Sequence, residues 1–151
     1  IFFLNSSLYA AGSSNDGPKK LKNYESAKIK IKKAKKLEKK GKDEKAQKLY
    51  KASLKFLLKA NEEISSDPDT LNYLGSVSRK LGKFDDAEVY YLLGLEIDPK
   101  HKGINEDLGE LYVITKRIKK ARERLAVLEN CNCEEYGELK GIIEGTKKSK
   151  Y

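Results

Sequence analysis

The stretch from Pro68 to His101, PDTLNYLGSVSRKLGKFDDAEVYYLLGLEIDPKH, decides the fold of this chain. It contains two amphipathic segments with a Gly-containing turn between them, and it closes on Asp-Pro. Apolar or small residues recur three and four positions apart, at Leu71, Leu74, Val77, Ser78 and Leu81 and then at Ala87, Tyr90, Tyr91, Gly94 and Leu95. Each segment therefore has one helical face to bury, and the pattern predicts a helical hairpin that packs against further hairpins.

This hairpin resembles the tetratricopeptide repeat (TPR), whose unit is about 34 residues long. The resemblance lies in Leu71, Leu74, Gly75 and Ser78 of the first segment, in Ala87 and Tyr91 of the second, and in Pro99. It implies that the small residues Gly75 and Ala87 let the two helices approach closely. It also implies that Pro99 stops the second helix.

Neighbouring stretches match the same repeat in register. One repeat further on, the corresponding residues are Asn105, Leu108, Gly109, Tyr112, Ala121 and Leu125. The position that corresponds to Pro99 is occupied by Cys133. Upstream, Gly41 with Ala46 and Tyr50 resembles the turn and second helix of an earlier repeat. That turn precedes the one at Gly82 by 41 residues, so about seven extra residues are placed in a second helix running from Asp43 to about Ile64.

The expected architecture is all-α. It is a right-handed superhelical stack of about three TPR hairpins, near residues 23–64, 68–99 and 102–129, within a domain of residues 23–145. After the cysteines, Leu139, Ile142 and Ile143 follow at helical spacing and predict a capping helix at 133–145. The residues expected to pack the repeats together are Leu71, Leu74, Gly75, Ala87, Tyr91, Pro99, Leu108, Gly109, Tyr112, Ala121 and Leu125.

Charge is distributed unevenly along the chain, whose net charge is +9. Residues 19–60 hold 17 Lys against 4 acidic residues, whereas residues 61–99 hold 3 basic against 9 acidic residues. Clustered lysines suit nucleic acid, but Arg, which makes bidentate base and phosphate contacts, does not occur before Arg79. The basic hairpin is therefore interpreted as a solvated, salt-sensitive face, and no specific nucleic-acid binding is expected.

Residues 1–11, IFFLNSSLYAA, combine an apolar run with small residues at Ala10 and Ala11. This pattern is typical of the end of a secretory signal peptide, and the run is too short to span a bilayer. The alternative is a retained apolar segment that docks in a groove of its own chain or of a neighbouring copy. The signal peptide is preferred and predicts a periplasmic or extracellular protein, with a flexible leader at 12–22 and a basic tail at 146–151.

Cys131 and Cys133 are followed by Glu-Glu-Tyr, an ending that resembles small exported TPR proteins of proteobacteria. Three interpretations of the cysteines stay open: a local disulfide, a metal site, and buried or intermolecularly paired thiols. The disulfide is ranked first for an exported protein. A metal site would need two more ligands, and His101 is the only histidine, so no metal is assigned. His101 itself is given no chemical role.

By resemblance, the first helices of successive hairpins line a concave groove for a partner. The residues expected there are Asp69, Asn72, Ser76, Arg79, Lys80, Glu106, Asp107, Glu110, Val113 and Ile114. A groove floor with this acidic content would prefer a basic or apolar ligand segment.

No nucleophile–base pair, phosphate-binding loop or metal-ligand spacing occurs in the sequence, so neither catalysis nor a cofactor is expected. The leading hypothesis is a non-catalytic scaffold or adaptor of the cell envelope that binds a peptide or helix of another protein. An alternative is self-assembly into a head-to-tail oligomer or filament, with the basic first hairpin against the acidic second hairpin of a neighbour. A weaker alternative is binding of an anionic polymer or membrane surface through the Lys-rich hairpin.

Overall fold

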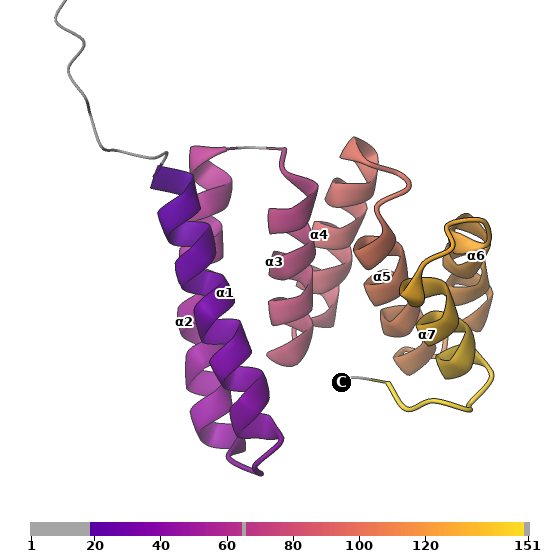
Figure 1. The fold of residues 1–151 in the computed structure, drawn as a ribbon, viewed down its shortest axis with the longest axis horizontal. Coiled ribbons are helices and arrows are strands. Elements are labelled where there is room, and N and C mark those ends of the chain that lie inside the picture. The colour runs from indigo at the N-terminus through magenta and orange to yellow at the C-terminus, as the bar shows by residue number, and fades with distance from the viewer. Residues whose placement is uncertain (1–18, 65, 150–151) are drawn as a thin grey trace, which may run out of the picture.

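A computed structural model describes residues 19–64 and 66–149. Within these residues the chain forms seven helices and no strand: α1 Lys19–Glu38, α2 Asp43–Glu63, α3 Pro68–Lys80, α4 Phe84–Ile97, α5 Lys102–Ile114, α6 Ile118–Leu128 and α7 Glu134–Ile143. Three antiparallel hairpins stand in a row, and α7 follows the third (Figure 1). The predicted all-α repeat stack is confirmed.

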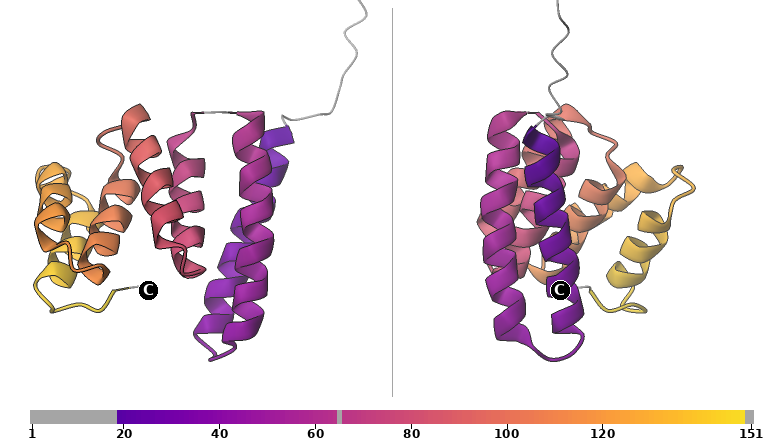
Figure 2. Two further views of the ribbon diagram at one scale, coloured as in Figure 1. Left: turned by 180° about the vertical axis from the view of Figure 1, so that it is seen from behind. Right: turned by 60° about the vertical axis from the view of Figure 1, so that its left-hand side comes forward.

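The helices of the stack lie in two layers. Seen from behind, α2 lies in front of α1, whereas α3 and α5 remain visible beside α4 and α6 (Figure 2). Neighbouring hairpins contact each other through α2 with α3 and α4 with α5, and α7 packs on α5 and α6. In the described part of the chain, no helix is both long and apolar enough to cross a bilayer.

The N-terminal predictions meet the structure only in part. The proposed signal peptide at 1–11 and the leader up to residue 18 lie outside the described residues. Residues 19–22, expected in the leader, instead form the first turn of α1, so that boundary was wrong. The reason is composition: the run of Gly, Ser, Asn and Pro ends at Pro18, and the following Lys-Lys-Leu-Lys are good helix formers.

The first hairpin is longer than the second. Helices α1 and α2 have 20 and 21 residues, whereas α3 and α4 have 13 and 14. Helix α2 ends at Glu63, one residue before the predicted limit near Ile64. The difference in length between the helices of the two hairpins is about two helical turns. Helices α1 and α2 accordingly project below the end of α3 (Figure 1).

The residues expected to pack the repeats together lie mostly in two buried clusters. One cluster joins the first hairpin to α3, and the other joins α4 to the third hairpin. The residues that are buried as expected are Leu71, Leu74, Gly75, Ala87, Tyr91, Leu108, Gly109, Tyr112 and Ala121. Leu125 is half-buried, and Pro99 is exposed just beyond α4, where its carbonyl accepts a hydrogen bond from Asn105 Nδ2 at 3.1 Å.

Gly75 and Gly109 occupy the same slot of successive repeats, and both allow close packing. A Cβ at Gly75 would overlap the Tyr91 ring of the same hairpin, as the resemblance implies. At Gly109 the nearest side chain is Leu139 of α7, 2.5 Å from an added Cβ, although the repeat pattern points to Leu125. The capping helix therefore supplies the contact that a second helix makes in the repeat before it.

The turn inside each hairpin uses a left-handed backbone. Gly41 and Gly82 have φ of 65° and 74°, and Lys116 takes the equivalent place in the third hairpin with φ of 60°. A side chain in this region costs about 1–2 kcal/mol, whereas Gly adopts it freely. We expect Lys116→Gly to raise the free energy of unfolding by about 0.5–1 kcal/mol, measured by urea denaturation. Glu123→Gly, at an exposed site within α6, should instead lower it by about 1 kcal/mol. A loss of stability in Lys116→Gly would contradict the assigned turn.

Candidate partner-binding groove

Two adjoining pockets open along the layer of first helices. The larger, of about 600 Å³, is lined by residues of α1 and by Tyr73 of α3. The smaller, of about 220 Å³, extends past α3 to Gly103, Glu106 and Asp107 of α5. The two pockets share Ile31, Lys35 and Tyr73, so they form one continuous hollow, here called the groove.

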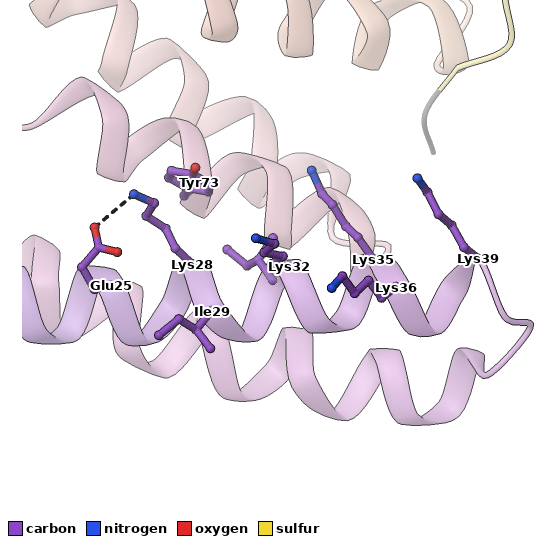
Figure 3. A pocket seen from close by; sticks show the side chains of 9 residues that line it. Glu25, Lys28, Ile29, Lys32, Lys35, Lys36, Lys39 and Tyr73 are labelled. Atoms are coloured by element: carbon purple, nitrogen blue, oxygen red, sulfur yellow. Dashed lines mark hydrogen bonds and ion pairs between the residues drawn. The ribbon is translucent and has the colours of Figure 1, made fainter.

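Five lysines of α1 line the larger pocket and are here called the lysine wall: Lys28, Lys32, Lys35, Lys36 and Lys39. Lys28, Lys35 and Lys39 extend from α1 toward the side on which Tyr73 lies (Figure 3). The Lys28 ammonium donates to Glu25 Oε1 at 3.0 Å, and this hydrogen bond raises the pKa of Lys28. In the described part of the chain the other four make no ion pair, so the wall of the groove is strongly positive.

Tyr73 is held in place at the centre of the groove. Its ring lies 5.6 Å from that of Tyr24, in an edge-to-face arrangement with an interplanar angle of 78°. This geometry is favoured by the charge distribution of aromatic rings. Burial raises the pKa of Tyr24, so its hydroxyl stays neutral over the physiological range. The aromatic pair therefore presents a fixed apolar surface beside the lysine wall.

Arg79 is the centre of a buried polar network under the groove. Its side chain is fully buried, and it donates to the carbonyl oxygen and Oδ1 of Asp107 at 2.7 and 3.0 Å. It also lies 3.4 Å from Oε2 of Glu110, whose side chain is fully buried as well. Asp107 accepts a further hydrogen bond from the Ser76 hydroxyl at 2.6 Å. The network joins α3 to α5 and fixes the floor of the groove.

A second polar cluster joins the first hairpin to the second. Lys80 Nζ lies 3.1 Å from Glu38 Oε2, which also accepts a hydrogen bond from the Tyr50 hydroxyl at 2.9 Å. The side chain of Gln47 donates to the backbone carbonyl of Lys80 at 2.9 Å. These contacts tie the end of α3 to α1 and α2, so the two sides of the groove are connected.

The structure brings together about half of the residues predicted to line the groove. The smaller pocket is lined by Asn72, Ser76, Lys80, Glu106 and Asp107. Arg79 and Ile114 line a separate pocket with Glu38 and Phe84. Glu110 is buried, Val113 and Ile114 pack against the second core cluster, and Asp69 is exposed beside His101.

The prediction missed the lysine wall, although its signal is present in the sequence. The resemblance carried positions of α3 and α5 into the groove but none of α1, because the register of the first repeat was fixed only at its turn and second helix. The four-, three- and four-residue steps from Lys28 to Lys39 would have placed these lysines on one helical face.

The expectation of an acidic floor is not supported by the geometry. Arg79 offsets one of the two negative charges of Asp107 and Glu110, Glu110 is fully buried, and Glu106 is only 7% exposed. The net charge that remains open to a ligand therefore comes from the lysine wall, and it is positive.

A family model described as a tetratricopeptide repeat matches residues 68–101. Residues 68–101 are a tetratricopeptide repeat. The repeat comprises α3, the turn at Gly82 and α4, and it ends at His101, just before α5. Comparison with curated proteins found no match. Tetratricopeptide repeats are protein-interaction modules that are typically non-catalytic, and repeat stacks use their concave surfaces for binding.

The junction that follows the repeat depends on His101, which was assigned no role. His101 Nδ1 accepts a hydrogen bond from the backbone N–H of Ile104 at 3.2 Å and so caps α5. Its Nε2 lies 3.0 Å from Asp69 Oδ1 of α3. With Nδ1 as acceptor, the ring proton sits on Nε2 and is donated to Asp69. His101 therefore connects the start of the repeat to the start of the next hairpin.

A network on the other side of the TPR repeat joins it to the third hairpin. Glu88 of α4 accepts hydrogen bonds from Arg117 Nη1 at 2.9 and 2.7 Å and from the Tyr112 hydroxyl at 3.1 Å. The Arg117 guanidinium lies 4.5 Å from the centre of the Tyr112 ring. Burial, and then the nearby Glu88 carboxylate, raise the pKa of Tyr112 to about 12.

This raised pKa predicts a loss of stability in alkali. The unfolded chain releases the tyrosine proton near pH 10, whereas the folded chain holds it up to about pH 12. Folding therefore binds a proton in this window, and the free energy of unfolding falls as pH rises from 10 to 12. The stabilisation is fully present below pH 10. Between pH 10 and 12, the free energy of unfolding measured by urea denaturation should fall less in Tyr112→Phe than in the wild type. An equal fall in the two proteins would contradict the raised pKa of Tyr112.

Cys131 and Cys133 form a disulfide just before α7. Of the three interpretations left open, the local disulfide is the one that the structure has. In the described residues no group of three or more His, Cys, Asp or Glu side chains is arranged to hold a metal ion. Cys133 has an extended backbone conformation and is the N-cap residue of α7, so the disulfide lies at the N-terminus of the capping helix.

Proposed function

We propose that the chain is a non-catalytic scaffold of the cell envelope that holds a peptide or helix of another protein in the groove. The observation that carries this proposal is the continuous hollow over α1, α3 and α5. Repeat stacks bind partners on their concave surfaces, and the hollow includes residues of α3, the first helix of the matched repeat.

The groove combines the features expected of a peptide-binding surface. It offers a fixed aromatic ring at Tyr73, charged side chains along α1, and polar groups at Asn72 and Ser76. The buried Oδ1 of Asn72 accepts no hydrogen bond from the described residues.

The location at the cell envelope is supported by the disulfide. Disulfides persist in the periplasm and outside the cell, whereas thiols in the cytosol are kept reduced. Trapping with a thiol-alkylating reagent in intact cells tests this part of the proposal. We expect Cys131 and Cys133 to resist alkylation until a reductant is added. Alkylation of both thiols without reductant would contradict the proposed location.

Site-specific photo-crosslinking tests the proposed binding mode. A benzoylphenylalanine at Tyr73 should cross-link a defined peptide of another protein in cells, because this ring lies in the groove. The same probe at Lys48, an exposed residue of α2 outside the groove, is the matched control. The proposal fails if Tyr73 and Lys48 give the same cross-links, or if the probe at Tyr73 captures no protein.

Self-association is a second candidate, and the outer face of α4 favours it. Val89, Leu92, Leu93 and Ile97 are 55%, 44%, 43% and 42% exposed; Leu92 and Leu93 follow Val89 by three and four residues, and Ile97 follows Leu93 by four. Such a row is unusual on an isolated surface and would be covered in an oligomer or filament. Light scattering of the wild type and of Val89→Glu/Leu93→Glu decides this: a monomeric wild type removes the candidate, and an oligomer lost in the variant supports it.

A further inference from the structure

We infer that the occupant of the groove is an acidic segment of a partner protein, which lies along α1 with its carboxylates against the lysine wall. The inference rests on the proposed function and adds the chemistry of the partner. It commits to a protein segment; an anionic polymer, a membrane surface and a second copy of this chain are alternatives that the test separates.

The spacing of the lysines forms a regular row. Lys28, Lys32, Lys35 and Lys39 follow one another at steps of four, three and four residues, so they share one face of α1. The row is about 16 Å long at the rise of an α-helix. A partner helix with acidic residues at the same steps would place one carboxylate opposite each ammonium.

The positive charge of this row is not cancelled by the groove itself. Glu25 pairs with Lys28, Glu38 with Lys80 and Tyr50, and Asp107 with Arg79. The acidic side chains around the groove are thus already engaged, while Lys32, Lys35 and Lys39 form no ion pair within the described residues. At Lys32, Lys35 and Lys39, a ligand that brings carboxylates therefore gains attraction without displacing an existing ion pair.

The aromatic side chain beside the lysine row favours a protein over a polymer of phosphates. Tyr73 lies on the side of α1 toward which Lys28 and Lys35 extend (Figure 3). It is half-buried and held by Tyr24, so it offers a fixed apolar contact. An acidic protein segment can supply an apolar side chain to this ring, whereas a polyphosphate cannot. The absence of Arg from the lysine wall also argues against bidentate phosphate recognition.

The test uses the full chain and a fluorescein-labelled helical peptide of about 15 residues. Its Glu side chains follow the same steps of four, three and four residues, and a second peptide has Gln at each of these places. Fluorescence anisotropy at low salt should show saturable binding of the Glu peptide and at least about tenfold weaker binding of the Gln peptide. Added salt should weaken binding of the Glu peptide, because the contacts are solvent-exposed charge pairs.

Matched variants locate the binding. K32E/K35E/K39E reverses three lysines of the wall and should weaken binding of the Glu peptide at least about tenfold. K48E/K51E/K55E makes the same change in charge at exposed residues of α2 outside the groove and should change binding less than about threefold. Circular dichroism melts check that both variants are folded. Equal losses in the two variants would show an effect of net charge only and overturn the inference.

The remaining outcomes separate the other occupants. Inorganic polyphosphate or anionic vesicles that bind more tightly than the Glu peptide, and lose binding in K32E/K35E/K39E, would make the ligand a polyanion and overturn the inference. If light scattering shows oligomers of the wild type at low salt that are lost in K32E/K35E/K39E, the occupant of the groove is a second copy of this chain and the inference is overturned. A neutral or basic peptide cross-linked at Tyr73 would overturn the acidic partner but leave the scaffold proposal standing, whereas no cross-linked protein would overturn the scaffold.

Discussion

Arg79→Met is expected to lower the free energy of unfolding by about 3–5 kcal/mol, because it leaves buried charge without its partner. The guanidinium is fully buried and binds both Asp107 and the fully buried Glu110. Methionine fills a similar volume, so the loss comes mainly from the stranded carboxylates and not from a cavity. Urea denaturation at neutral pH measures the effect.

Two further variants distinguish buried charge from other causes. Arg122→Met, at an exposed site of α6, should change stability by less than about 0.5 kcal/mol. Glu110→Gln in the Arg79→Met background should recover part of the loss, because the amide carries no charge. The network does not hold α3 to α5 as described if Arg79→Met lowers the free energy of unfolding no more than Arg122→Met does. The same conclusion follows if adding Glu110→Gln to Arg79→Met lowers the free energy of unfolding further.

The fold could be predicted from sequence because the repeat signals are local. The spacing of Leu71 and Leu74 and the turn glycine at Gly82 describe one hairpin, and a second match in register fixes its neighbour. The length of α2 followed from the distance between two turns. These features depend on helical periodicity alone, which a linear sequence records directly.

The charge of the groove could not be predicted in the same way, because it depends on which carboxylates are paired. From the sequence alone, Asp107 and Glu110 are expected to be unpaired carboxylates that a ligand can reach. Only the packing of α3 on α5 brings Arg79 against them. His101 was missed for a similar reason, since its two partners lie on different helices. Pairings between helices depend on the crossing of the hairpins, which the spacing of residues along one helix does not specify.

The capping helix gives the second large effect: Leu139→Ala is expected to lower the free energy of unfolding by about 2–5 kcal/mol. Leu139 is fully buried and is the side chain nearest to Gly109 of α5. In a repeat stack each unit is stabilised mainly by its neighbours, and the third hairpin has α7 on its outer side. Hydrogen exchange should therefore show faster opening of α5 and α6 than of α1 and α2 in this variant.

The same contact predicts that two harmful substitutions partly compensate each other. Gly109→Ala alone should cost about 1–3 kcal/mol, since its Cβ would lie 2.5 Å from a Leu139 methyl carbon. In the Leu139→Ala background that methyl carbon is gone, so the new Cβ has room. The double variant should be more stable than the sum of the single losses predicts, by about 1–2 kcal/mol in a double-mutant cycle. Strict additivity would mean that α7 does not rest on Gly109, and that Leu125 of α6 fills this slot as the repeat pattern alone indicates.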